Sequence, residues 1–436
     1  MKQQNLKVGF LSQWDINDPN AMSGSVHRSM LALKDAGVDI IDLSDIESEM
    51  TNAKIVKKIK NIKEYFTKHF PESLKNSYQK KLTQISLTKN RYVTYNDYQK
   101  TISRANEISR LAQAKLNQKT LELDVLFGIC TSTLFFNLQT ELPIIYASDT
   151  TANLLNTTYP EYMLRSDGYH QACNEIEKKS LGKSSFFLPA AACAHDSAIE
   201  FYELAKEKVH LVEFGAHITP SQALAKKTPP DINNLQLCLV AADPVRKQLD
   251  LCISTTEALN NMGWKTVLHY IGPHHDALEK TSVVRWHGRL QLSDSEDRKT
   301  HQEIMEASHW MLLPSTAEAF GIAPCEAAHF AVPSIVTEVG GLPTVVQHQH
   351  TGVVMPLSAN AKDYAEEIIS ISKDESRYLA MSDAALERAH NTLSWSVWAE
   401  KVKSLMYQAV LEKKQVLNKD RNPATSPTPA LRSQAL

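Results

Sequence analysis

Short apolar runs rich in β-branched residues alternate along this chain with segments of helical periodicity, and no other feature of the sequence limits the fold as strongly. Strands that alternate with helices predict parallel sheets wrapped by helices. We expect a first series of strands at residues 7–11, 38–43, 125–129, 143–147, 185–188 and 209–213. We expect a second series at residues 235–240, 265–271, 283–287, 310–313 and 334–337.

The two series predict two doubly wound α/β domains, since 436 residues are too many for one ordinary core. We place the first domain at residues 1–216, with a long helical insertion at about 47–118, and the second at 217–393. A Pro- and Lys-containing linker, residues 223–234, precedes the second series of strands. A cleft is expected between the domains, at the carboxyl ends of both sheets, where such sheets bind ligands. The tail, residues 417–436, has too little apolar surface to fold and is expected to be disordered.

Composition excludes several classes of protein. A hydrophobic fraction of 43% and a charged fraction of 22% are typical of a soluble globular protein. A net charge of −2 argues against a dedicated nucleic-acid binder. The 6 cysteines are scattered, which indicates reduced thiols of a cytosolic protein and no zinc site or disulfide framework. No apolar run is long enough for a signal peptide or a bilayer span, so we expect a protein that is at most peripheral to a membrane.

The most informative stretch is PSTAEAFGIAPCEAAHFAVPSIVTEVGGLPT, which begins at Pro314 directly after a predicted strand. Gly321 and Pro324 mark a turn and the opening of a helix, because proline is tolerated in the first helical turn. Glu318 therefore lies in the loop and Glu326 on the helix, and we expect both to face an open cleft. The helix start offers free amides and a positive dipole end, which suit a diphosphate. The alternative is that the spacing of the two glutamates arises by chance on a solvated helix.

A second stretch, LCLVAADPVRKQLDLCI, is predicted to form a strand, a loop and a helix, with Lys247 at the end of the loop and Arg246 beside it. Fixed cations and helix amides stabilise the charge that develops on a leaving diphosphate, without a metal. The alternative is an ordinary solvated Arg-Lys pair at a helix start. No DxD cluster occurs in a suitable loop, and the paired histidines His274–His275 and His348/His350 have no third ligand in view, so we expect no metal site.

These two stretches resemble glycosyltransferase family 4, the large retaining family with the GT-B fold. Glu318 and Glu326 match the two acids of the E-x7-E motif of that family. The resemblance implies that Glu318 binds hydroxyls of the donor sugar and that Glu326 holds the ribose hydroxyls of the nucleotide. A carboxylate suits a diol because it accepts two hydrogen bonds. The resemblance also implies that the amides of Phe320, Gly321 and Ile322 line the sugar and phosphate pocket.

The resemblance also implies a role for the basic pair Arg246 and Lys247. Lys247 matches the lysine that neutralises the leaving diphosphate, although Gln248 replaces the glycine that usually follows it. Ala242 stands where many members carry a partner arginine, and the resemblance implies that Arg246 replaces it here, as in members that read R-K at this point.

The resemblance is weaker in the first domain. The turn Ser23–Gly24–Ser25 resembles the small-residue loop near the donor phosphates, and its alternative is a helix cap at one of the serines. Asp149 stands where members carry a His or Asp near the reacting carbon, which implies a role in orienting the acceptor. The alternative is that Asp149 caps the helix that begins near Thr150. The helix at about 394–412 resembles the last helix of the family, which returns to the first domain.

The insertion carries a lysine-rich amphipathic segment, residues 53–91, in which basic side chains far outnumber Glu64 and Glu72. Such a helix can bind anionic lipid headgroups. The alternative is a solvated lysine face whose apolar stripe packs on its own domain. We therefore expect, as one of two alternatives, contact with the inner face of the membrane.

Together these features predict a cytoplasmic, retaining glycosyltransferase. It would move a hexosyl group from a nucleotide-diphospho-sugar to a glycan or lipid-linked acceptor, in the synthesis of cell-surface polysaccharide or glycolipid. No further cofactor and no nucleic-acid partner are expected. Two alternatives remain at this point: a catalytically silent GT-B subunit that binds sugar nucleotides or a partner, and a sugar-nucleotide epimerase on the same fold.

Overall fold

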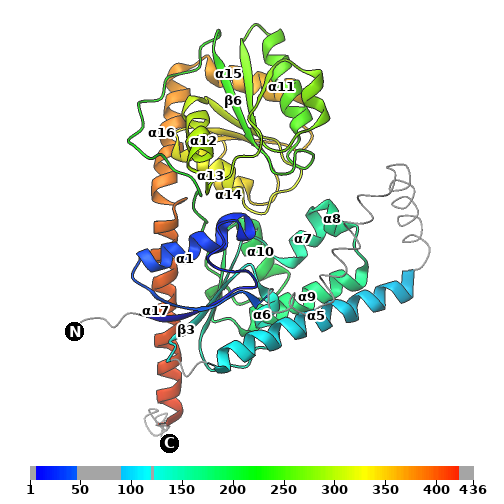
Figure 1. Cartoon of the computed structure of the whole chain (residues 1–436), viewed down its shortest axis with the longest axis vertical. Helices are drawn as coiled ribbons and strands as arrows, with labels where there is room; N and C mark the ends of the chain where they lie inside the picture. Colours follow the sequence, from blue (N-terminus) through cyan, green and yellow to red (C-terminus); the bar gives the residue numbers. More distant parts are fainter. Residues whose placement is uncertain (1–5, 47–89, 119–121, 422–436) are drawn as a thin grey trace, which may run out of the picture.

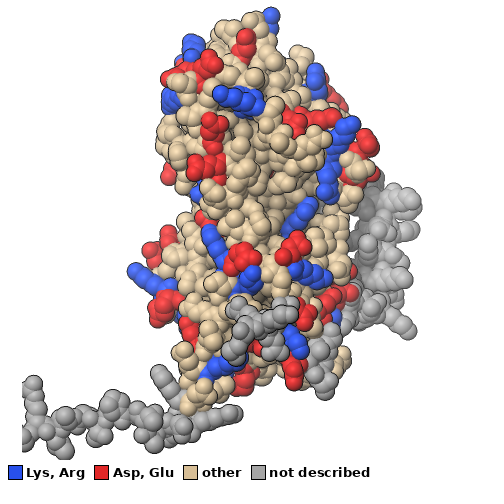
Figure 2. All heavy atoms as spheres, turned by 90° about the vertical axis from the view of Figure 1, so that its left-hand side faces the viewer, with Lys and Arg blue, Asp and Glu red and all other residues tan. Residues whose placement is uncertain are grey.

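Two parallel sheets, each covered by helices, form the protein in its computed structural model, which describes residues 6–46, 90–118 and 122–421 (Figure 1). The lysine-rich segment lies almost wholly outside these residues, so its contact with membranes stays a prediction. Within the described ranges, no helix combines the length and the apolar character that crossing a bilayer requires. On the face shown in Figure 2, basic and acidic side chains are interspersed over both domains.

The sheet of the N-terminal domain has 5 strands in the order β2-β1-β3-β4-β5, all parallel. Its strands are β1 (Lys7–Leu11), β2 (Asp39–Leu43), β3 (Val125–Ile129), β4 (Ile144–Ser148) and β5 (Phe186–Pro189). The helices of this domain are α1 (Ser25–Asp35), α5 (Asn90–Gln118), α6 (Ser132–Phe135), α7 (Ala152–Thr158), α8 (Pro160–Met163), α9 (Asp167–Lys183) and α10 (Ala192–Glu200).

The alternation of side chains along β4 decides what each face of this sheet contacts. Ile145 and Ala147 belong to the core that also contains residues of α1 and of the last helix, α17 (Trp395–Arg421). Ile144 and Tyr146 belong to a second core that contains residues of α5 and α9. Successive side chains of a strand point to opposite faces. Ser148, two residues after Tyr146, therefore shares the face toward α5 and α9.

The sheet of the C-terminal domain has 6 parallel strands in the order β11-β10-β9-β6-β7-β8. These strands are β6 (Leu235–Val240), β7 (Thr266–Ile271), β8 (Val284–Trp286), β9 (Trp310–Leu313), β10 (Ser334–Thr337) and β11 (Gly352–Met355). The helices around them are α11 (Leu249–Asn261), α12 (Ser295–Ala307), α13 (Ile322–His329), α14 (Leu342–Val345), α15 (Ala361–Ser372) and α16 (Glu375–Asn391).

The last helix connects the two domains. It continues from α16 along one side of the molecule and packs against α1 and β3 (Figure 1). Trp398 is fully buried, and its ring centroid lies 5.8 Å from that of Phe127. The return of this helix to the first domain agrees with what the resemblance implies. The helix extends to Arg421, past Leu417, where the disordered tail was expected to begin.

Two strand predictions differ from the structure. Residues 209–213 form no strand. They make one isolated bridge, Val209 to Phe187, although the amides of His210 and Val212 donate to the carbonyls of Phe187 and Pro189 in β5. The edge strand β11, by contrast, was not predicted. The remaining predicted strands are present within a residue or two of their expected ends.

Candidate functional site

The loop that carries Glu318 leaves the carboxyl end of β9 and enters α13, whose N-cap is Gly321. A second loop, at Gly340, fixes its backbone. The amide of Gly341 donates to the carbonyl oxygen of Glu318 at 3.1 Å. A Cβ atom on Gly340, which has a φ of +51°, would lie 1.7 Å from that same oxygen. Only glycine permits this approach, so the Gly-Gly pair sets where Glu318 lies.

Glu318 faces two cations. Its Oε2 atom lies 3.2 Å from Nη1 of Arg246 and 3.7 Å from Nζ of Lys247. The side chains of Arg246, Lys247 and Glu318 are only 17%, 13% and 13% exposed. Oδ2 of Asp243 also lies 3.7 Å from Nε of Arg246, so two carboxylates balance the two cations in a partly desolvated site, where charge interactions are stronger than in water.

The loop between β6 and α11 holds these cations in place. Asp243 Oδ1 accepts hydrogen bonds from the amides of Val245 and Arg246, each at 3.1 Å. The guanidinium of Arg246 donates to the carbonyl of Ala317 at 2.6 Å, so the β6 loop is joined to the loop of Glu318. Gln248, the N-cap of α11, has a left-handed φ of +56°. The position that carries glycine in the family thus keeps a conformation that glycine adopts most readily.

Glu326 lies on α13 as predicted, but it does not face an open cleft. It is 4% exposed, and the amides of His217 and Ile218 donate to its carboxylate. Burial raises the pKa of Glu326 to about 8, although the nearby Lys247 and Arg28 lower it in part. Glu318 and Lys247 are largely buried as well. The expectation of an open cleft was wrong because the chain segment after residue 213 packs directly against α13.

The first domain contributes Gly24 to this region. Gly24 is the N-cap of α1 with a φ of +95°, and neither Ser23 nor Ser25 caps the helix through its side chain. A Cβ atom on Gly24 would lie 3.3 Å from Nδ1 of His217. His217 provides one of the amides that bind Glu326, so the turn at Gly24 lies close to the E-x7-E motif.

Tyr159, between α7 and α8, is a site residue that the sequence did not indicate. Its ring centroid lies 5.4 Å from the guanidinium carbon of Arg246, a distance at which a cation interacts with an aromatic face. The amide of Ala319 also donates to its hydroxyl. Tyr159 thus connects the N-terminal domain with both loops of the C-terminal domain. No motif surrounds it, and only its contact across the cleft identifies it.

Asp149 follows β4 and lies near Glu318. Burial is the main cause that raises the pKa of Asp149, and the negative charge of Glu318 adds to the effect. Thr151, whose hydroxyl accepts from the amide of Leu154, caps α7, so the alternative role of Asp149 as a helix cap is wrong. The thiol of Cys130 donates to Oδ1 of Asp149 at 3.7 Å.

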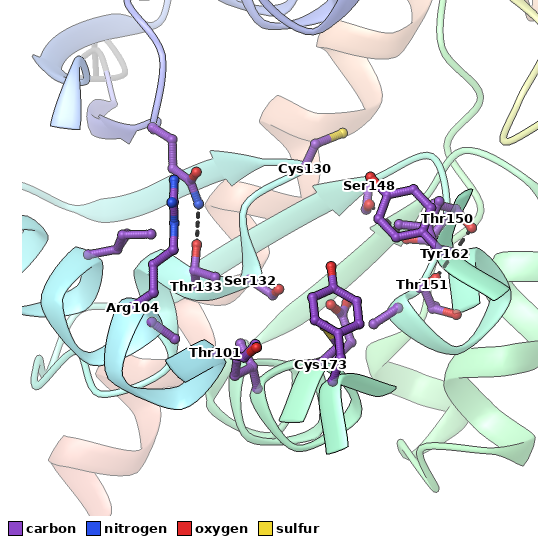
Figure 3. A pocket seen from close by; sticks show the side chains of 18 of the residues that line it. Thr101, Arg104, Cys130, Ser132, Thr133, Ser148, Thr150, Thr151, Tyr162 and Cys173 are labelled. Atoms are coloured by element: carbon purple, nitrogen blue, oxygen red, sulfur yellow. Dashed lines mark hydrogen bonds between the residues drawn. The ribbon is translucent and has the colours of Figure 1, made fainter. Parts of the chain in front are cut away.

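Asp149 also lines a cavity of about 520 Å³ in the N-terminal domain, which is bounded by α5, α9 and the ends of β3 and β4 (Figure 3). Met22, in the turn before Gly24, lines it as well. Glu177, a buried acid on α9, lines the same cavity. Burial raises the pKa of Glu177 to about 7. No sequence pattern indicated Glu177, since a lone glutamate on an amphipathic helix has no distinguishing pattern.

Comparisons with known proteins agree with this arrangement. Residues 223–388 match the profile of the family Glycosyl transferases group 1. The galactosyltransferase WaaB of the lipopolysaccharide outer core, in its apo form, superposes with a TM-score of 0.56 at 10% identity and covers 94% of this chain and 100% of its own. An Anabaena protein in complex with UDP and glucose superposes with a TM-score of 0.54 at 13% identity, covering 93% and 100%. The chain therefore has the GT-B fold, with two Rossmann-like domains, and its second domain is a glycosyl transferases group 1 domain.

Among curated relatives, the D-inositol 3-phosphate glycosyltransferase of Mycobacteroides abscessus is 22% identical over 288 residues, which are 62% of this chain and 62% of that protein. The chain thus spans less than two thirds of this relative. The structure brings together Glu318, Lys247 and Arg246, and places Glu326 beside them. The side chain of Phe320 instead packs on Phe214, and only backbone groups of residues 320–322 are available at the start of α13.

Proposed function

We propose that this protein is a retaining glycosyltransferase that moves a hexosyl group from a nucleotide-diphospho-sugar to a glycan or lipid-linked acceptor. One observation carries the proposal. In a GT-B fold, the Glu318 carboxylate faces two largely buried cations, Arg246 and Lys247, at the carboxyl ends of β9 and β6. This is the edge of a parallel sheet at which ligands bind.

The basic pair would hold the donor diphosphate. A diphosphate entering the site would replace the Glu318 carboxylate, which faces both cations, with several phosphate oxygens, and Arg246 can bind two of them at once. The amides of Phe320, Gly321 and Ile322, at the start of α13, would add hydrogen bonds and a positive dipole end. Glu318, released from the cations, would accept hydrogen bonds from hydroxyls of the sugar.

Glu326 would hold the ribose of the nucleotide only after a rearrangement. Its carboxylate already accepts from the amides of His217 and Ile218. A ribose diol would have to share or replace these hydrogen bonds, which requires α13 to move relative to the segment around His217. Gly24 lies beside that segment and would leave room for the donor phosphates.

Asp149 would orient the acceptor. During transfer the bond between the anomeric carbon and the diphosphate breaks, a bond to the acceptor oxygen forms, and the acceptor hydroxyl loses its proton. Arg246 and Lys247 would stabilise the negative charge on the leaving diphosphate, so no divalent ion is needed for that purpose. We infer a cytoplasmic reaction, in keeping with the six free cysteines of the chain, within the synthesis of a cell-surface polysaccharide or glycolipid.

Release of nucleoside diphosphate from a panel of nucleotide-sugars tests the proposal. We expect turnover with at least one donor, including in excess EDTA. Lys247→Ala should lower kcat by on the order of a hundredfold or more, because the charge it faces grows in the transition state. Lys362→Ala, an exposed lysine on α15, should leave kcat unchanged. Binding of nucleoside diphosphate without any turnover would instead favour the catalytically silent subunit.

A further inference from the structure

The cavity beside Asp149 has one wall of neighbouring polar groups. The Tyr146 hydroxyl donates to Oε1 of Glu177 at 3.2 Å. Ser148 lies beside both Tyr146 and Cys130, and its own hydroxyl donates to the carbonyl oxygen of Thr150 at 2.8 Å. Cys130 in turn donates to Asp149. These polar groups follow one another from Asp149, nearest the cleft, to Glu177, and every one of them lines the cavity.

Other lining residues are apolar or aromatic. Tyr162 on α8 and Tyr169 on α9 are only partly buried, and the carbon side chains of Leu155 and Ile176 lie in the same lining. Figure 3 shows Tyr162 near Thr150 and Thr151, and Thr101 and Ser132 elsewhere around the cavity. The cavity therefore offers carbon and aromatic surface together with hydrogen-bonding groups. A sugar or cyclitol ring has the same dual character, with apolar C–H faces and a hydroxyl-bearing edge.

The charges of the lining favour an uncharged ligand. The partly or fully buried ionisable groups are acids, Asp149 and Glu177, and burial raises the pKa of both. The lining cations, Lys100 and Arg104, are exposed on α5. A phosphate or carboxylate near Glu177 would meet like charge in a desolvated site, which is unfavourable. A hydroxyl there would donate to the carboxylate instead.

We propose that this cavity receives the reacting end of the acceptor, and that this end is an uncharged polyhydroxylated ring, a sugar or a cyclitol. The inference rests on the proposed transfer activity and narrows its acceptor. It distinguishes this chain from its relative in Mycobacteroides abscessus, whose name specifies a phosphorylated inositol.

Saturation-transfer NMR on the full chain tests the proposal with two sets of probes. The neutral set is myo-inositol and the methyl glycosides of glucose, galactose and mannose. The charged set is myo-inositol 1-phosphate, glucose 6-phosphate and glucuronate. We expect binding from the neutral set and weaker or no binding from each charged counterpart. Tighter binding of the charged probes would overturn the proposal.

Two variants connect such binding to the cavity. Tyr162→Ala should lower the affinity for the neutral probe by roughly two- to tenfold through loss of an aromatic contact. Glu177→Gln keeps the shape of the side chain. It should lower the affinity for the neutral probe by about tenfold or more at pH 8, because a charged hydrogen-bond acceptor is lost. Glu203→Gln, an exposed acid outside the cavity, is the matched control and should change nothing.

Titration with nucleoside diphosphates separates this proposal from the transferase assignment. All three variants should bind the nucleotide like the wild type. Neutral-probe binding that neither Tyr162→Ala nor Glu177→Gln alters would overturn the acceptor proposal alone. A wild-type protein that binds no nucleoside diphosphate would overturn the transferase assignment, on which the acceptor proposal rests.

Discussion

At the scale of single residues, Glu326 links the chemistry of the site to the stability of the fold. Its pKa is raised to about 8 by burial, whereas an unfolded glutamate titrates near pH ~4.3. The folded chain therefore binds this proton more tightly than the unfolded chain. The contribution of Glu326 to stability is complete below about pH 4 and is lost as the pH rises toward about 8.

We predict that Glu326→Gln removes this pH dependence. Glutamine stays neutral and can still accept hydrogen bonds from the amides of His217 and Ile218. The free energy of unfolding, measured with urea between pH 5 and 8.5, should fall less steeply with pH in the variant, by at most about 1.4 kcal/mol per pH unit. Glu366→Gln, at an exposed position of α15, should follow the wild type. If the free energy of unfolding changed with pH in the same way in Glu326→Gln and the wild type, the folded chain would not hold a proton on Glu326, and the prediction would be wrong.

Gln248 offers a second prediction at this scale. Its φ of +56° places a side chain in the left-handed region, which costs a non-glycine residue roughly 1 kcal/mol. Gln248→Gly should therefore raise the free energy of unfolding by up to about 1 kcal/mol, because the relief of strain outweighs the added freedom of the unfolded chain. Glu366→Gly, within α15, should lower it by about 1 kcal/mol. A stability loss of equal size in both variants would mean that Gln248 is not strained.

The sequence predicted residues whose partners are close along the chain. Glu318, Glu326, Arg246 and Lys247 lie in short strand–loop–helix units, where the order of residue types fixes which end of the sheet they reach. It did not predict Tyr159, because the contact of that residue with Arg246 depends on how the two domains pack against each other. The burial of Glu326 was missed for the same reason, since the amides that bind it come from the segment around His217.

At the scale of secondary-structure elements, the loop at Gly340 positions the loop of Glu318. We predict that Gly340→Ala lowers both stability and donor affinity, because a Cβ atom would lie 1.7 Å from the carbonyl oxygen of Glu318. Gly263→Ala is the matched control: Gly263 also has a positive φ, +91°, but its Cβ would meet nothing within 4 Å. The control should lose about 1 to 2 kcal/mol from backbone strain alone.

Urea unfolding and the KM for the donor distinguish the two variants. Gly263→Ala should keep the wild-type KM, whereas Gly340→Ala should raise it and lose more stability than the control. Equal losses of stability with an unchanged KM would show that the contact between the two loops has no role in the site.

Most strands were predictable because buried parallel strands are continuous apolar runs bounded by turns. The edge strand β11 was missed, since Gly352–Met355 begins with a glycine, follows an exposed turn and is only half-buried at its end. Residues 209–213 show the opposite case. Their apolar content fits a strand, but they pair with β5 through one isolated bridge and two backbone hydrogen bonds, too few for a strand.

At the scale of the whole molecule, contacts of several kinds hold the two domains together. The Ala192 amide donates to the Thr344 hydroxyl at 2.9 Å. Oε1 of Glu213 lies 3.8 Å from Nη2 of Arg388, and Oε2 of Glu213 lies 3.6 Å from Nζ of Lys401. Phe214 stacks on Trp395 with ring centroids 5.4 Å apart. These contacts lie around the segment that also binds Glu326, so movement of one domain against the other would alter the site directly.

Calorimetric titration of UDP, GDP, ADP and TDP into the full chain tests the central claim most directly, namely that the cleft binds the diphosphate of a nucleotide-sugar through Arg246 and Lys247. We predict that at least one of these nucleotides binds, and that Lys247→Ala weakens it by about tenfold or more through loss of a charged hydrogen bond. Lys362→Ala should bind it like the wild type. Absence of binding by all four nucleotides, or unchanged affinity in Lys247→Ala, would contradict the account.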